Sequence, residues 1–408
     1  MLFAEILILS LQIYIYNKTY KFKINLISIN CILWILLLFL NRCYFSADTN
    51  GEFFIVIGCT IFNFSHFIAR QIAIINTKQT KVVWINYDLK RVSVIIKFLF
   101  VFEILRVLLS FYAVIKIAGS FTYFFLNNTD VRNKYLARQE SILFEIFYNL
   151  VNYLAYTGLI IVSLYLGQSY KNNLKVEFNK KLFFLFWILL EVIAGLITMS
   201  KMGLFASVII FVTGFYYSIG ERKYQRKFVE KIIPMLVMFL SIYLILIGMQ
   251  RNYANDSKGL VLKVFEKATE YFVLPVQAFY RLLSGTLNIT SNGKHFSFIK
   301  INEVSTNVFT AFGIFYLDYG ILGILIAPAI LGFLSGYIIR FRNNSLSAIA
   351  FYAFYIMGVI FSFYNVMQKQ KIYLLVPIFI LILQKIFLEK YIRGAKHDFS
   401  LLLRYRNV

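Results

Sequence analysis

Acidic residues, cysteine, histidine and proline are all scarce in this chain. Its 408 residues include 19 Asp and Glu, 3 His, 3 Cys and 4 Pro. The cysteines, at positions 31, 43 and 59, give neither a disulfide framework nor a metal-ligand spacing. The chain also lacks a P-loop, a nucleophile elbow and the paired-histidine motif of zinc proteases. These absences argue against an enzyme that is driven by nucleotides or depends on a bound metal.

Apolar residues dominate what is present. The chain is 60% hydrophobic and only 15% charged, which is typical of polytopic membrane proteins. About 20 apolar residues cross a hydrocarbon core as a helix, and backbone groups in lipid need partners within the protein. The sequence therefore predicts an all-α polytopic integral membrane protein, with residues 1–408 forming one transmembrane domain. About eleven spans are expected, at 2–16, 24–41, 53–69, 93–118, 143–166, 182–199, 203–219, 233–250, 320–339, 345–365 and 372–388.

The basic residues are concentrated in alternate connections between these spans. One set of connections carries 24 Lys and Arg, whereas the other carries 14, half of them in a single long loop at 251–307. Basic loops face the cytoplasm, so the long loop is expected outside and the C-terminus inside. The net charge of +23 thus reflects membrane topology, and we expect no nucleic-acid partner.

The long outer loop, 251–307, has a pattern of its own. Apolar and charged residues over 259–272 have the spacing of an amphipathic helix at the membrane surface. Pro275 is expected to end this helix, and a second apolar turn, 276–283, carries Arg281. The polar stretch 288–300 is expected to form a flexible rim.

Several cations on the expected outer side are candidates for binding an anion. Arg251 stands where a span meets the loop, and it either extends to lipid headgroups or binds a phosphate through its planar fork. Lys201 lies in a short turn between two spans, as a second candidate cation or as a solvated turn residue. Arg132 is a weaker candidate, and nearby Arg138 is interpreted as surface charge.

A few polar residues lie inside or next to the spans. Glu103 and Arg106 share one helix face and form either a neutral pair or a functional site, while Glu191 could approach a buried cation. Asn307 and Asp318 are expected to cap helices, with a sugar hydroxyl contact or general-base role as the alternative. The spacing of Gly332 and Gly336 predicts a close approach between two helices.

The second half of the chain resembles the bacterial O-antigen polymerases, which join oligosaccharide repeat units. Three segments carry the resemblance: Thr306-Asn307-Val308-Phe309-Thr310, then Asp318-Tyr319-Gly320-Ile321-Leu322-Gly323 with Gly332, and Arg251 at the start of the large loop. The turn Ser200-Lys201-Met202-Gly203 is similar to a family turn that more usually carries Arg. The departure at Lys201 leaves the role of that residue open.

The resemblance implies a metal-independent glycosyltransferase of the bacterial inner membrane, with the large loop in the periplasm. It would transfer the growing glycan from its polyprenyl-pyrophosphate carrier onto the next lipid-linked repeat unit, with no cofactor. Its other partners would be membrane lipids and, in some pathways, a chain-length regulator and a flippase. The implied catalytic residues are Arg251, with Asp318 or Glu303 as base. Lys201, Arg281, Arg132 and Asn307 would bind substrate.

Three other functions compete with this interpretation. One of them, a membrane-embedded structural or acyltransfer protein, has no motif in its favour. A flippase or transporter of lipid-linked oligosaccharide would gather charges within its spans, whereas this chain has few such charges and one dominant outer loop. An O-antigen ligase would use similar chemistry with a different acceptor. The sequence does not distinguish the two acceptors.

Overall fold

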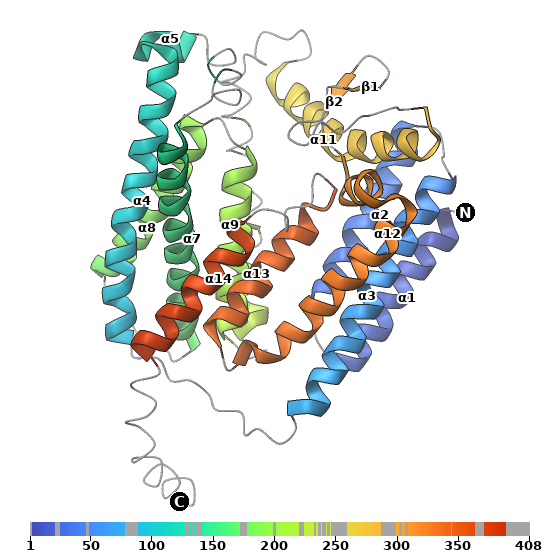
Figure 1. Cartoon of the computed structure of the whole chain (residues 1–408), viewed down its shortest axis with the longest axis horizontal. Coiled ribbons are helices and arrows are strands. Elements are labelled where there is room, and N and C mark those ends of the chain that lie inside the picture. The colour runs from blue at the N-terminus through green and yellow to red at the C-terminus, as the bar shows by residue number, and fades with distance from the viewer. Residues whose placement is uncertain are drawn as a thin grey trace, which may run out of the picture. The chain divides into compact units, whose positions relative to one another are not determined.

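A computed structural model describes residues 2–20, 25–45, 49–77, 89–126, 141–171, 178–198, 201–219, 224–231, 259–286, 299–301, 304–306, 309–343, 345–363 and 371–388. It also describes the isolated positions 131, 134, 234, 235, 238, 242 and 245. Almost all of these residues are helical (Figure 1). The predicted all-helical class is therefore confirmed.

Four of the described helices are long and apolar enough to cross a membrane. They cover Leu26–Tyr44, Asn50–Ile74, Ile142–Gly167 and Ala311–Phe341. Shorter apolar helices cover most of the other expected spans. This pattern is compatible with a membrane protein, while the number of spans and their orientation remain predictions. Most of the expected span 233–250 lies outside the described residues.

The chain divides into two compact units. Unit 1 comprises Met1–Lys81, Phe265–Arg340 and Phe354–Gln370, and unit 2 comprises Val82–Val264, Phe341–Ala353 and Lys371–Val408. The elements of unit 1 are α1 (Leu2–Tyr20), α2 (Leu26–Tyr44), α3 (Thr49–Thr77), most of α11 (Leu260–Leu283), β1 (Ile299–Ile301), β2 (Val304–Thr306) and α12 (Ala311–Ile338). Those of unit 2 are α4 (Leu89–Ala118), α5 (Phe121–Leu126), α7 (Ile142–Lys171), α8 (Phe178–Ile197), α9 (Lys201–Ile219), α14 (Ile372–Leu383) and a π-helical turn at Gln384–Leu388. A 3-10 helix (Ile339–Asn343) and α13 (Leu346–Ile360) contain residues of both units.

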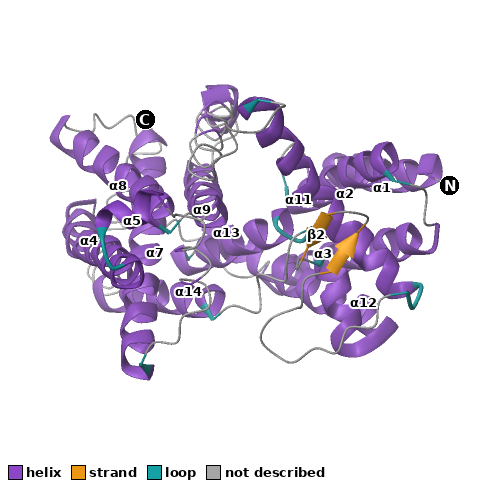
Figure 2. Ribbon diagram, turned by 90° about the horizontal axis from the view of Figure 1, so that it is seen from above, coloured by secondary structure: helices purple, strands orange, loops and turns teal. Residues whose placement is uncertain are grey.

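Close packing between α3 and α12 organises unit 1. The two helices lie side by side in both views (Figure 1, Figure 2). A Cβ atom at Gly332 would overlap the backbone carbonyl of Phe62, and one at Gly336 would overlap the backbone carbonyl of His66. Only glycine permits backbones to come this close, so the close approach predicted from the Gly332 and Gly336 spacing is confirmed.

Buried hydrogen bonds add to this packing. The Ser335 hydroxyl lies 2.8 Å from Nδ1 of His66, which links the same faces of α12 and α3. The Asn63 amide of α3 donates to Gln12 of α1 at 2.7 Å and accepts from Asn30 of α2 at 3.1 Å. Amide and hydroxyl pairs of this kind hold helices together in apolar surroundings, where no water competes for the bond.

The start of α12 differs from the sequence prediction. The helix begins at Ala311, nine residues before the expected span, and its N-cap is Thr310. The Thr310 hydroxyl accepts a hydrogen bond from the Gly313 backbone N–H at 3.0 Å. Thr310 is therefore the N-cap of α12. Asn307 lies outside the described residues, and Asp318 lies within the helix, two residues before its kink. Gly320, at φ 62° and ψ −151°, kinks the helix where the prediction placed its start.

Helix α11 corrects a second expectation, that Pro275 ends the amphipathic helix. The helix passes through Pro275 and continues to Leu283. Proline removes one backbone hydrogen bond and bends a helix without necessarily ending it, and Figure 1 shows α11 with a bend. The residues after the proline, Val276 to Tyr280, are all buried, so side-chain packing offsets the lost hydrogen bond.

Two short strands were not predicted. Strands β1 and β2 form an antiparallel pair in which Ile299 lies opposite Thr306 and Ile301 lies opposite Val304. The segment is too short for the alternating pattern that marks a strand in sequence. Only Ile299 and Lys300 fall within 288–300, the stretch for which the sequence suggested a flexible rim, and the rest of that stretch lies outside the described residues.

Helices α4, α7, α8, α9 and α14 of unit 2 form a bundle. Helix α7 packs against α4, α9 and α14, while α8 packs against both α4 and α9. Gly158 of α7 makes room for the Trp187 ring of α8, and Gly214 of α9 makes room for the Ser163 hydroxyl of α7. Side chains from four helices, α4, α7, α8 and α9, thereby come together inside this unit.

We expect Gly332→Ala to lower the free energy of unfolding by about 1–3 kcal/mol, because the new methyl group meets backbone that cannot rotate away. The measurement is denaturant-induced unfolding of the purified protein in detergent. Ile330→Ala is the control, because Ile330 lies on α12 with its side chain 54% exposed. Equal stability of Gly332→Ala and wild type would contradict the close contact between α3 and α12.

Candidate functional site

Helix α11 is the longest described part of the long loop on which the predicted chemistry depends. The side chains from Val273 to Tyr280 are buried, whereas Leu262 near the start of the helix is 57% exposed. The second half of α11 is therefore packed into unit 1. The amphipathic helix predicted for this loop is present, and it is longer than predicted.

The end of α2 and the start of α3 hold α11 in place. The Gln277 amide donates to Oδ1 of Asn41 at 2.8 Å, and both side chains are buried. The Tyr280 ring lies against Gly51, where a Cβ atom would overlap the ring. An amide pair and an aromatic ring seated on glycine fix both the rotation and the position of α11 along its axis.

A partly buried ion pair lies next to this contact in sequence. Arg42, the last basic residue of α2, contacts Glu52 of α3 through Nη2 and Oε2 at 2.5 Å. The Glu52 side chain is fully buried, and Glu5 of α1 is close enough to interact electrostatically with both partners. Arg42 thus neutralises carboxylates where α1 begins, α2 ends and α3 begins.

The end of α11 presents Arg281. The Thr286 backbone N–H donates to the Arg281 carbonyl at 3.1 Å, and the Gly285 N–H donates to the Leu282 carbonyl at 3.2 Å. With Gly285 at φ 68°, these two bonds form a Schellman motif, which ends the helix. Arg281 is half-buried in the last turn, where its positive charge interacts favourably with the negative end of the helix dipole.

The structure describes only some of the predicted site residues. Arg251, Arg132, Asn307 and Glu303 lie outside the described residues, as does Arg138. Lys201 is the first residue of α9, and its side chain is also outside the described part. Asp318 is exposed on α12, two residues before the kink at Gly320. The grouping of these residues into one anion site therefore stays a prediction.

A second candidate site lies inside unit 2. Nη2 of Arg106 lies 2.7 Å from Oε1 of Glu103 and 2.9 Å from Oε2 of Glu191, and all three side chains are buried. The Ser207 hydroxyl donates to the same Glu191 oxygen at 2.8 Å, and the Tyr156 ring lies 5.5 Å from the guanidinium. The predicted approach of Glu191 to a buried cation is confirmed. Ser207 and Tyr156 were missed because serine and tyrosine are ordinary residues in apolar helices.

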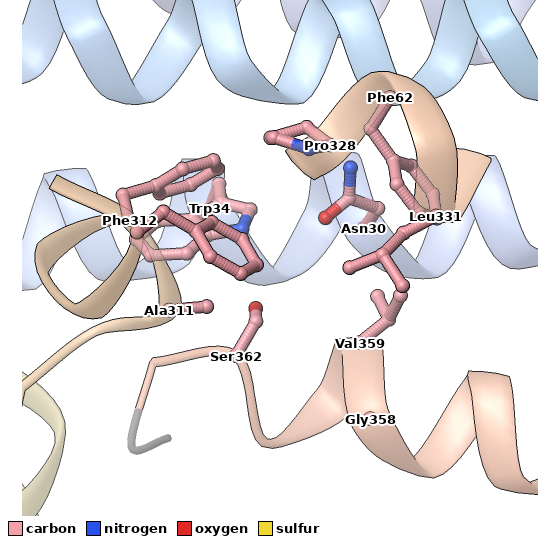
Figure 3. A pocket seen from close by; sticks show the side chains of 11 residues that line it. Asn30, Trp34, Phe62, Ala311, Phe312, Pro328, Leu331, Gly358, Val359 and Ser362 are labelled. Atoms are coloured by element: carbon pink, nitrogen blue, oxygen red, sulfur yellow. The ribbon is translucent and has the colours of Figure 1, made fainter. Parts of the chain in front are cut away.

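A small cavity in unit 1 brings together polar and aromatic groups. It has a volume of about 40 Å³ and is lined by Asn30, Trp34, Phe62, Ala311, Phe312, Phe315, Pro328, Leu331, Gly358, Val359 and Ser362. Figure 3 shows the Asn30 and Ser362 side chains among the apolar ones. Within the described residues, Trp34 Nε1 and the Ser362 hydroxyl have no hydrogen-bond partner. The space suits a few water molecules that would satisfy both groups.

Gln277→Leu should loosen α11, because it removes the donor to Asn41 and leaves a buried amide unsatisfied, at a cost of about 1–3 kcal/mol. Hydrogen exchange of the backbone amides from Val273 to Leu282 should become faster in this variant. The control is Leu262→Ala on the exposed part of the same helix. Unchanged protection of α11 in Gln277→Leu would show that the amide pair does not hold it.

Comparison with known proteins gives no assignment: no family model, no curated protein and no solved structure matches the chain.

Proposed function

We propose that the protein polymerises lipid-linked oligosaccharide repeat units at the outer face of the bacterial inner membrane. The observation that carries this proposal is helix α11. It is a long amphipathic helix within the one large loop, it is packed into unit 1 by Gln277 and Tyr280, and its last turn carries a basic residue, Arg281. A transferase acting on a membrane-bound substrate needs such an element, which stays at the lipid surface and presents cations there.

The chemistry needs no metal or nucleotide. The acceptor hydroxyl oxygen attacks the anomeric carbon of the donor sugar, the bond from that carbon to the pyrophosphate oxygen breaks, and the hydroxyl proton passes to a carboxylate. Negative charge accumulates on the departing pyrophosphate, and fixed cations stabilise it. Arg251 is proposed for this role, with support from Lys201, Arg281 and Arg132.

The remaining roles fall to groups that accept protons or hydrogen bonds. Asp318 or Glu303 would take the acceptor proton, and Asn307 would bind a sugar hydroxyl. Asp318 is exposed next to the kink at Gly320, so a substrate has access to it. Polyprenyl-pyrophosphate oligosaccharide is the proposed substrate, with the loop in the periplasm and the C-terminus in the cytoplasm.

A flippase or transporter of lipid-linked oligosaccharide is the second candidate function. The cluster of Glu103, Arg106 and Glu191 favours it, because charges buried within apolar helices commonly mark transport or ion pathways. The sequence suggested a pair of Glu103 and Arg106, whereas the structure joins Glu191 to the same guanidinium. An O-antigen ligase activity differs from the first proposal only in the acceptor.

Arg251→Ala is expected to abolish long-chain polysaccharide, and Arg281→Ala to reduce it, because each removes positive charge that would face the leaving pyrophosphate. The measurement is the ladder of surface polysaccharide on a gel, with each variant confirmed in the membrane fraction. Arg138→Ala is the control and should leave the ladder nearly normal. A normal ladder from Arg251→Ala would remove the proposed role of that residue.

Deleting the protein separates the candidate functions. Loss of long chains with single repeat units still on the cell surface supports polymerisation. Loss of surface units together with trapped lipid-linked units inside the cell supports a flippase. Surface glycan that is fully polymerised but remains on its lipid carrier supports a ligase.

A further inference from the structure

The buried cluster of unit 2 has an imbalance of charge. It contains two carboxylates, Glu103 of α4 and Glu191 of α8, and one guanidinium, Arg106 of α4. Glu103 is 0% exposed, Glu191 is 5% exposed and Arg106 is 7% exposed. With both carboxylates ionised, the cluster would carry one net negative charge in apolar surroundings. An uncompensated buried charge is strongly unfavourable, so such a charge is usually neutralised.

The hydrogen bonds of the cluster are also incomplete. Each carboxylate contacts Arg106 through one oxygen, and within the described residues the other oxygens, Oε2 of Glu103 and Oε1 of Glu191, have no partner. Two buried carboxylate oxygens without donors are uncommon, because charged acceptors gain most from hydrogen bonds. One additional positive charge at these oxygens would complete the cluster.

The other groups around the cluster do not supply that charge. Tyr156 faces it from α7, and Ser207 faces it from α9. Tyr373 of α14, which packs on α7, interacts with Tyr156. These groups are neutral donors or acceptors. Within the described residues, Arg106 is the one cation in contact with the two carboxylates.

We propose that this cluster is a proton-binding site, in which Glu103 and Glu191 together hold one exchangeable proton. The proton comes from solvent and forms an O–H bond at one of the unpartnered oxygens, and the charge of the cluster changes from −1 to 0. The site follows from the arrangement of α4, α7, α8 and α9, and it is independent of the proposed polymerase function.

A proton fits this site better than a metal ion. A hard metal cation needs several oxygen ligands, whereas among the described residues of the cluster only two carboxylate oxygens are unpartnered. The guanidinium of Arg106, which contacts both carboxylates, would also repel a second cation. A proton needs a single oxygen and adds no bulk to a packed interior.

Infrared spectroscopy of the purified protein at neutral pH tests the proposal, because a protonated carboxyl has a C=O band that shifts in heavy water. The difference spectrum of wild type minus Glu103→Gln should contain one protonated carboxyl, and so should wild type minus Glu191→Gln. In each variant the remaining carboxylate pairs with Arg106 alone and needs no proton. The double variant should also lose one carboxyl and not two, which is the signature of a shared proton.

Controls make the result specific. Glu145→Gln, at an exposed position in the first turn of α7, should leave the band unchanged. Arg106→Met should gain one protonated carboxyl, because both glutamates then lack a cation. Glutamine has the shape of protonated glutamate, so the glutamine variants carry the test even if Arg106→Met does not fold.

Two results would overturn the proposal. The absence of a protonated carboxyl in all three difference spectra would mean that both glutamates are ionised. If sodium chloride then stabilised the wild type more than choline chloride did, the cluster would bind a metal cation and not a proton. The loss of one carboxyl in each single variant and two in the double variant would mean that each glutamate carries its own proton.

Discussion

The structure depends above all on one constraint, which is that polar groups inside apolar helices must find partners within the protein. In water, an unpaired amide or carboxylate is solvated at little cost, but inside apolar packing it costs a large part of the stability of the protein. The amides of the buried residues Asn30 and Asn63 and of the partly buried Gln12 meet this constraint by bonding to one another across α1, α2 and α3. Their partners lie on different helices, so satisfying them also fixes how the helices pack.

Two buried charge clusters follow from the same constraint. In unit 1, Arg42 neutralises Glu52 near Glu5, and this cluster stands beside the contact that holds α11. In unit 2, Arg106 bridges Glu103 and Glu191 in the interior of the bundle. Each cluster has two carboxylates for one guanidinium. The cluster in unit 1 lies next to the contact with α11, in the loop proposed for glycan transfer. The cluster in unit 2 is the feature that supports transport as the alternative function.

The position of α11 links packing to the proposed chemistry. Its Pro275 bend and its Schellman ending at Gly285 set the direction and length of the helix, and the buried face after the bend anchors it to α2 and α3. Arg281 is therefore presented by a fixed element and not by a free loop. Electrostatic stabilisation of a leaving group requires this kind of preorganisation, since a cation that must first be ordered loses much of its effect.

The sequence by itself determined the helical class, most helix positions and the close contact at Gly332 and Gly336, because continuous apolar runs and small-residue spacing are local signals. It also placed an amphipathic helix in the long loop and suggested that Glu191 meets a buried cation. Only the tertiary structure decided that Thr310 caps α12, that α11 passes through Pro275 and that Arg42 is neutralised by Glu52. Each of these features depends on residues that are distant in sequence, or on which of several polar residues caps a helix. Tertiary packing determines both, and the local periodicity of the sequence does not encode it.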